Sequence, residues 1–275
     1  MLTAKGKLRN TEIRMYGEEH NNIDNQVYEA LDLQGILMVE HSTLLCHVKP
    51  EEIPLFKNAK GSEWVFFTQK MAGNQNIVCF DTRLAHGYLT VTAERMLHTL
   101  ADKLPEGNIE DIKGFLDPVL RTVQQLNSNK DTFDIVEGYI ELCLDTLQMQ
   151  LKAITNLLRI RKSRGVDTVF TAKDHPLLAG IPLRDLLIGI AHTVADNLKR
   201  VCSVSVDMGL IRAIHGYASE QQPLVHVFAG KNHIVRVSEW LNLKIKGLST
   251  DDLENAKLEM DSSPEMDEAI AGLKI

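Results

Sequence analysis

Four short apolar runs have the length expected of strands in a buried sheet: residues 13–16, 36–39, 76–80 and 224–228. Between the first two runs, residues 23–33 carry apolar side chains at helical spacing. Asn21 and Asn22 precede this helix as caps, and Gly35 follows it as a stop. The opening of the chain is therefore predicted to be a βαβ unit, in which both strands end at the same edge of a parallel sheet.

The middle of the chain is helical in pattern. Residues 91–165 are predicted to form three helices, the longest from about residue 133 to residue 164. Residues 183–215 are predicted to form a further long helix with apolar side chains along one face, and residues 234–243 a last one. This order of elements predicts an α/β fold: a small, mostly parallel sheet flanked by helices, with a large all-helical insertion.

The predicted elements divide the chain into an α/β core, a helical insertion and a tail. The core comprises residues 1–90 and 222–248, and residues 91–221 form the insertion that is predicted to pack on it. A chain of 275 residues with 44% hydrophobic side chains can bury such a core. The tail, residues 249–275, is acidic, because the stretch from Asp251 onward carries −6 of the net charge of −7. We expect a mobile appendage on a nearly neutral body.

Charge, hydropathy and cysteine spacing exclude several classes of protein. A nearly neutral body offers no basic face to nucleic acid. No stretch reaches the ~20 apolar residues of a membrane span, and residues 1–9 lack the apolar run of a signal peptide, so we expect a cytoplasmic protein without a membrane partner. Secretion into a host without a signal peptide is compatible with the same features. The cysteines are too scattered for a disulfide framework or a zinc ribbon: Cys46, Cys79, Cys143 and Cys202.

Two copies of the pattern Gly-x-x-His stand at the ends of predicted strands. The first is Gly17-Glu18-Glu19-His20, and the second is Gly230-Lys231-Asn232-His233. Ligands of open α/β sheets bind at the carboxyl edge, where such strand ends meet. We therefore expect the two histidines to lie at one site, although more than 200 residues separate them.

Two further polar residues follow predicted strands. Glu40 ends the apolar run 35–39, and burying a carboxylate there is costly unless it is paired or functional. We expect it to lie beside His20 at the sheet edge. Arg83 follows the strand at 76–80. Its guanidinium could pair with Asp81 or with Glu40, and it also suits an oxyanion or an anionic substrate group.

These positions define the candidate site. Its expected catalytic residues are Glu18, His20, Glu40, Arg83 and His233, and its expected substrate contacts are His41, His86 and Asn232. One chemistry open to them is binding of a metal by His20, Glu40 and His233 with a position left for water. The other is metal-free hydrolysis, with a histidine or glutamate as general base on water and Arg83 steadying the oxyanion. The chain has no Gly-x-Ser-x-Gly and no phosphate-binding glycine loop.

The ordered set of motifs resembles the Tiki/TraB superfamily, which includes ChaN-like haem-binding proteins and the erythromycin esterases. The resemblance covers about residues 11–90 and 222–243: a strand with Gly-Glu-x-His, a strand ending in glutamate, a strand followed by arginine, and a late strand with Gly-x-x-His. It implies a fold like that of the erythromycin esterases and ChaN. It also implies hydrolysis, of peptides with a divalent metal such as manganese, zinc or cobalt in Tiki proteins, or of esters in the erythromycin esterases.

Three functions follow from these observations. The first is a hydrolase of a small-molecule or peptide substrate, in which His20 or Glu18 activates water, Glu40 orients it or binds a metal, and His233 completes the site. The second is a non-catalytic module that holds haem or another ligand through its histidines. The third is a host-directed effector or interaction scaffold whose helical block and acidic tail bind partners. A homodimer is compatible with each.

Overall fold

A computed structural model of the chain describes residues 2–19, 35–42, 76–81, 134–220, 222–257 and 263–273. The chain forms two compact units, one of residues 1–85 and 203–258 and the other of residues 86–202 and 259–275. The boundary between them falls within the long helix α6 (Leu183–Ser219), which contributes to both. The predicted helix at residues 23–33 and the first two of the three helices predicted before residue 165 lie outside the described residues.

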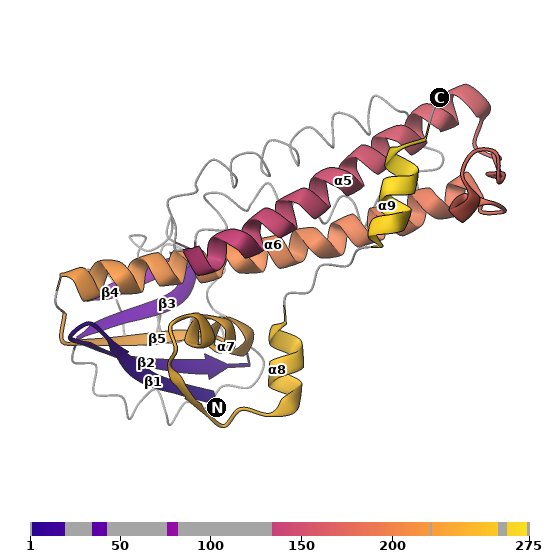
Figure 1. The fold of residues 1–275 in the computed structure, drawn as a ribbon. Helices are drawn as coiled ribbons and strands as arrows, with labels where there is room; N and C mark the ends of the chain where they lie inside the picture. The colour runs from indigo at the N-terminus through magenta and orange to yellow at the C-terminus, as the bar shows by residue number, and fades with distance from the viewer. Residues whose placement is uncertain are drawn as a thin grey trace, which may run out of the picture. The chain divides into compact units, whose positions relative to one another are not determined.

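The described part of the first unit contains a six-stranded mixed sheet and is α/β (Figure 1). The strands are β1 (Leu2–Leu8), β2 (Thr11–Glu18), β3 (Ile36–Ser42), β4 (Ile77–Asp81), β5 (Leu224–Gly230) and β6 (Lys244–Lys246). Their order is β4-β3-β5-β2-β1-β6. The four strands β4, β3, β5 and β2 run parallel, and β1 is antiparallel to both β2 and β6.

Strand β5 lies between β2 and β3, which corrects the prediction that the first two strand ends are neighbours. Val225, Val227 and Phe228 of β5 are all fully buried, so both faces of this strand are covered. A strand that is apolar on both faces is stabilised at the centre of a parallel sheet. The last strand of the chain therefore inserts between two earlier ones and separates the carboxyl ends of β2 and β3.

Strand β1 was not predicted, because its lysines and its glycine obscure the alternation of buried and exposed positions that marks a strand. Leu2 and Ala4 are buried, whereas Lys5 and Lys7 are exposed on the other side of the strand. β1 and β2 form a hairpin in which Leu8 pairs with Thr11, and the turn is closed by Arg9 with a positive φ of 54°. Strand β2 also extends through Glu18, so the glycine of the first motif lies within the strand and not after it.

Helix α7 (Lys231–Trp240) follows β5 at once, as the strand–glycine–helix pattern predicts, although it begins three residues before the predicted Ile234. Its residues Ile234, Val235 and Val237 are buried, and the Ser238 hydroxyl contacts Met15 Sδ of β2 at 3.5 Å. A Cβ at Gly17 would lie 3.2 Å from Lys231 Cα, so the small residue permits the close approach of strand and helix. Helix α8 (Thr250–Ala256) begins with a capping box between Ser249 and Asp252.

The described part of the second unit is helical. Helix α5 (Asp134–Arg164) ends at Gly165, whose φ of 93° suits a C-terminal stop, and both features match the prediction. The apolar stripe predicted on α6 is buried against α5: Leu187, Ile190, Ala191, Val194 and Leu198 belong to its core. The 3₁₀ helix η4 (Pro176–Leu178) lies in the turn that joins the two helices.

Part of the acidic tail packs into this second core, which corrects the expectation of a mobile appendage. Helix α9 (Pro264–Ala271) lies against α5 (Figure 1) and buries Ala269 and Ile270. The Asn156 side chain of α5 donates a hydrogen bond of 2.6 Å to the Ala271 carbonyl at the helix end. The high net charge of the tail concealed this short apolar face. No helix in the described part of the chain is both long and apolar enough to cross a membrane.

Replacement of Gly35 by alanine should destabilise the first unit by at least about 2 kcal/mol. The residue has a φ of 101°, and a Cβ there would lie 2.3 Å from the Leu224 carbonyl oxygen. Chemical denaturation measures the loss. Gly216→Ala, on α6 in the same unit, is the matched control. Apart from its own turn of the helix, no atom of the described residues lies within 4 Å of its Cβ position, and alanine favours a helix. Equal stability of the two variants would contradict the close approach of β3 and β5.

The second unit should respond to pH through Asp267, the buried carboxyl at the start of α9. Burial raises the pKa of Asp267 above its usual 3.8, although the hydrogen bond from Gln150 opposes the shift. A raised pKa means that the folded state loses stability as the pH rises through that pKa. Asp267→Asn should therefore gain stability relative to the wild type between acid and neutral pH. Thermal unfolding as a function of pH tests this, with Glu268→Gln of the exposed face as the control.

Candidate functional site

The described residues of the first motif, Gly17 to Glu19, and Gly230 of the second lie at the ends of the neighbouring parallel strands β2 and β5. Gly17 of β2 pairs with Ala229 of β5, and Glu18 pairs with Gly230. An ion pair of 2.6 Å between Glu19 and Lys231 joins the two motifs directly. This pairing raises the pKa of Lys231, and the nearby Asp252 of α8 adds to the effect while burial opposes it.

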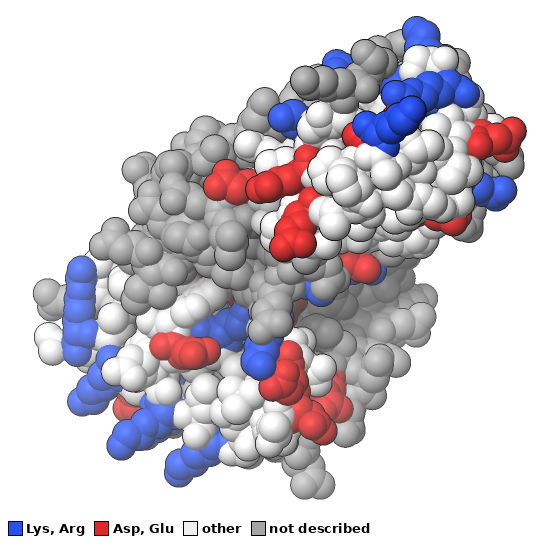
Figure 2. Space-filling view, turned by 45° about the vertical axis from the view of Figure 1, so that its right-hand side comes forward, with Lys and Arg blue, Asp and Glu red and all other residues white. Residues whose placement is uncertain are grey.

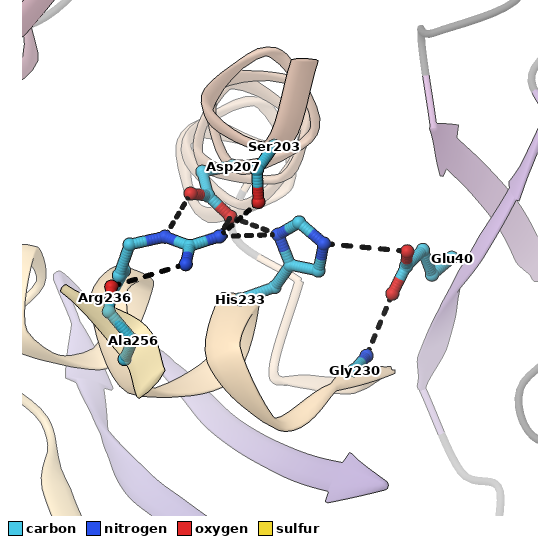
Figure 3. Close-up of polar contacts among 7 residues, drawn as sticks. All are labelled: Glu40, Ser203, Asp207, Gly230, His233, Arg236 and Ala256. Atoms are coloured by element: carbon cyan, nitrogen blue, oxygen red, sulfur yellow. Dashed lines mark hydrogen bonds and ion pairs between the residues drawn. The ribbon is translucent and has the colours of Figure 1, made fainter. Parts of the chain in front are cut away.

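Glu40 reaches the second motif from the other side of β5. It follows Val39, which pairs with Phe228, and it is buried with 6% of its surface exposed. Its Oε2 accepts a hydrogen bond of 2.7 Å from the Gly230 N–H, as Figure 3 shows. Gly230 is the N-cap of α7 and has no side chain with which to cap the helix, so the carboxylate of another strand stabilises that terminus.

His233 lies in the first turn of α7, buried, and both of its ring nitrogens face carboxylates (Figure 3). Nδ1 lies 2.5 Å from Asp207 Oδ1, and Nε2 lies 3.5 Å from Glu40 Oε1. The first distance is that of a short, charge-assisted hydrogen bond, and the second is longer than an ordinary N–H···O bond. Because a carboxylate only accepts, Nδ1 is the donor in the contact with Asp207, although Arg236 Nη2 also lies 3.0 Å from it. Nε2 faces the sheet edge.

Asp207 is itself held by an arginine. It is fully buried in α6, and its Oδ2 accepts a hydrogen bond of 2.6 Å from Arg236 Nε. Arg236 follows His233 by three residues and so lies on the same face of α7. Its other nitrogens donate to the Ser203 hydroxyl at 2.7 Å and to the Ala256 carbonyl at 3.3 Å. The guanidinium thus joins α6, α7 and α8 around one carboxylate.

The carboxyl edge of the sheet is rich in buried carboxylates. Glu18, Glu40 and Asp81 end or nearly end β2, β3 and β4, and each exposes less than a tenth of its surface. Asn232, a predicted substrate contact, is exposed beside His233 in α7. His41 lies in β3, and its side chain is outside the described residues, as are His20, Arg83 and His86 altogether.

The predicted metal ligands are brought together in part. Within the described ranges, no three side chains of His, Cys, Asp or Glu are grouped so that they could hold a metal ion. Glu40 Oε1 and His233 Nε2 supply two converging donor atoms at 3.5 Å, a separation close to that of two ligands on one tetrahedral ion. The third predicted ligand, His20, lies outside these ranges.

Sequence reasoning missed Ser203, Asp207 and Arg236. Asp207 had a signal in the sequence, because it is the one charged residue between Val201 and Ile211 in an apolar helix. Arg236 had another, since it stands one turn after the motif histidine. Neither signal identifies the partner, because Asp207 and His233 belong to different helices.

Comparison of the chain with family models, with curated proteins and with solved structures finds no match.

Asp207→Ala should destabilise the first unit by about 3–5 kcal/mol, because it leaves the buried guanidinium of Arg236 without its carboxylate. Urea unfolding measures the change. Glu239→Ala removes an exposed carboxylate from α7 and should change stability by less than about 0.5 kcal/mol. A second variant, Asp207→Leu with Arg236→Met, removes both charges and should be more stable than Asp207→Ala. If the double variant were no more stable than Asp207→Ala, the unpaired arginine would not be the cause of the lost stability.

Proposed function

We propose that the protein is a hydrolase that uses His233 as general base on a water molecule at the carboxyl edge of the sheet. The observation that carries the proposal is the line of Asp207, His233 and Glu40. One carboxylate holds Nδ1 at 2.5 Å, and the opposite nitrogen faces a second carboxylate beside the start of a helix. A histidine fixed in one tautomer by a buried carboxylate is the usual form of a general base.

Each group has a defined task in this reaction. Nε2 takes a proton from the water as its oxygen attacks the carbonyl carbon of an ester or amide, and Asp207 stabilises the imidazolium that forms. Glu40 accepts a hydrogen bond from the second hydrogen of the water, and this contact directs a lone pair of the water oxygen toward the carbonyl carbon. The proton on Nε2 then passes to the leaving alcohol or amine as the bond to the carbonyl carbon breaks. Arg83 is the residue that we expect to steady the oxyanion.

Two of these residues would also suit a divalent cation. Glu40 and His233 would hold it, with His20 as the expected third ligand, and Asp207 would orient the histidine as such second partners commonly do. A bound cation would supply a Lewis acid for the carbonyl and lower the pKa of water. The residues of the chain would keep the tasks of orienting water and moving its proton.

The order of the motifs and their place on the sheet support a family relationship and a substrate class. Two of the four motifs, the late Gly-x-x-His and the strand-end glutamate, contact each other at the sheet edge. We infer from their order a relationship to the Tiki/TraB superfamily, with an erythromycin esterase or ChaN-like arrangement in which residues 91–221 form a helical insertion. The substrate class that follows is a small ester or a peptide.

Glu40→Gln separates the chemical role of this residue from its structural role. The amide oxygen of glutamine can still accept the Gly230 hydrogen bond, so stability should change by no more than about 1 kcal/mol. The negative charge beside His233 is lost, so hydrolysis should fall at least about 100-fold, as it should in His233→Gln. The assay uses p-nitrophenyl acetate and a mixture of fluorogenic peptides, each with EDTA and with added manganese or zinc.

His192→Gln, an exposed histidine of α6, is the control and should keep full activity. Wild-type protein that hydrolyses neither probe under any of these conditions would contradict the proposal, as would full activity of His233→Gln. A haem titration of the same proteins distinguishes the binding-module hypothesis: a Soret band that is lost in His233→Gln would favour it over hydrolysis.

A further inference from the structure

Large apolar side chains are exposed at two places of opposite charge. Four large apolar residues are substantially exposed in the described part of the chain: Val166 (37%), Val169 (52%), Leu177 (49%) and Leu253 (44%). The first three lie in the turn between α5 and α6, and the fourth lies on α8. Apolar side chains gathered in one short segment, as in this turn, are typical of interaction surfaces. Leu253 is a single apolar residue, so its part in a contact rests on the charge of the helix around it.

The helix ends that flank this turn are basic, although the chain is acidic: Arg159, Arg161, Lys162 and Arg164 end α5, and Arg184 lies in the first turn of α6. We define the basic tip as residues 159–185, which carry six Lys or Arg and three Asp, a net charge of +3. Because the chain as a whole carries −7, the remainder carries −10. Arg159, Lys162, Lys173 and Arg184 are exposed. In Figure 2, basic side chains gather beside uncharged surface at the upper right, at the end of α5 and α6.

An ion pair and hydrogen bonds hold the basic tip in one conformation. Its apolar side chains are therefore exposed in an ordered turn. Asp174 pairs with Arg164 at 2.5 Å and also accepts hydrogen bonds from the Thr171 N–H and hydroxyl. These contacts lower the pKa of Asp174 to about 2, with Arg164 as the main cause. Phe170 and Leu178 fill the interior of the turn, and Val169 forms a β-bridge with Pro182.

Helix α8 has the opposite character. Residues 249–257 carry three acidic side chains against Lys257, a net charge of −2. Leu253 is exposed beside Asp251 and Glu254, whereas Asp252 is directed to the Ser249 cap and to Lys231. Glu254 also forms an ion pair with Lys257, which directly follows the helix. The capping box holds this surface in place as the turn contacts hold the basic tip.

We infer that these two surfaces bind each other between copies of the chain. Leu253 of one copy packs among Val169 and Leu177 of another, and the acids of α8 face the lysines and arginines of the basic tip. A second copy of the chain is the partner that both surfaces favour. The basic tip offers apolar side chains with basic ones around them, and α8 offers an apolar side chain with acidic ones around it, so each complements the other. The inference does not depend on the proposed hydrolysis.

Charge reversal on each side tests the contact. The full-length wild type should self-associate in sedimentation equilibrium, and more weakly at high salt because the pairs are exposed. Lys173→Glu with Arg184→Glu, and separately Asp251→Lys with Glu254→Lys, should each weaken association at least about tenfold. The protein that carries all four changes should associate more tightly than either double variant, because the charges are complementary again.

Lys152→Glu with Lys199→Glu is the matched control, since it reverses two exposed lysines of α5 and α6 outside the basic tip and should leave association unchanged. Leu253→Ser and Leu177→Ser, which change no charge, should also weaken it. A wild type that is monomeric at every concentration would overturn the inference, as would a quadruple variant no tighter than the double variants. Binding of a monomeric wild type to phosphatidylserine vesicles, lost in Lys173→Glu with Arg184→Glu, would assign the basic tip to a membrane surface instead.

Discussion

The buried carboxylate of Asp207 is the interaction on which the site depends. A fully desolvated charge is tolerated only when it is paired and hydrogen-bonded, and Arg236 supplies that pairing from the facing helix. The oxygen that the arginine binds only weakly, at 3.3 Å, is the one that contacts His233 at 2.5 Å. One ion pair therefore fixes α7 against α6 and at the same time determines which nitrogen of the histidine faces the sheet edge.

A second constraint comes from the connection between β5 and α7. Because the helix begins directly after Gly230, its first turn lies at the carboxyl edge of the sheet, next to the end of β3. A glycine N-cap has no side chain to offer, so Glu40 from β3 takes its place. The residue that stabilises the helix terminus is thus the residue that lies beside His233, and structural and chemical roles coincide at this position.

Several features of the fold followed from local pattern and others did not. The ends of α5 and the start of α6 were predicted closely, because long amphipathic helices with a glycine stop have strong local signals. Strand β1 and helix α9 were missed, since charged residues on their exposed faces outweigh the few apolar residues that pack. The insertion of β5 between β2 and β3 was also missed, because strand order depends on contacts between segments far apart in the chain.

The sequence by itself determined that Glu40, the late strand and the helix after it belong to one sheet edge, because parallel strands place their carboxyl ends together. Only the tertiary structure decided that His233 is held by Asp207 and Arg236 and that Glu40 caps α7. Helical periodicity shows that a face is buried, but it does not show which face of which other helix lies opposite. That choice depends on pairing a buried charge across two elements, and the partners are 26 and 29 residues apart in the chain.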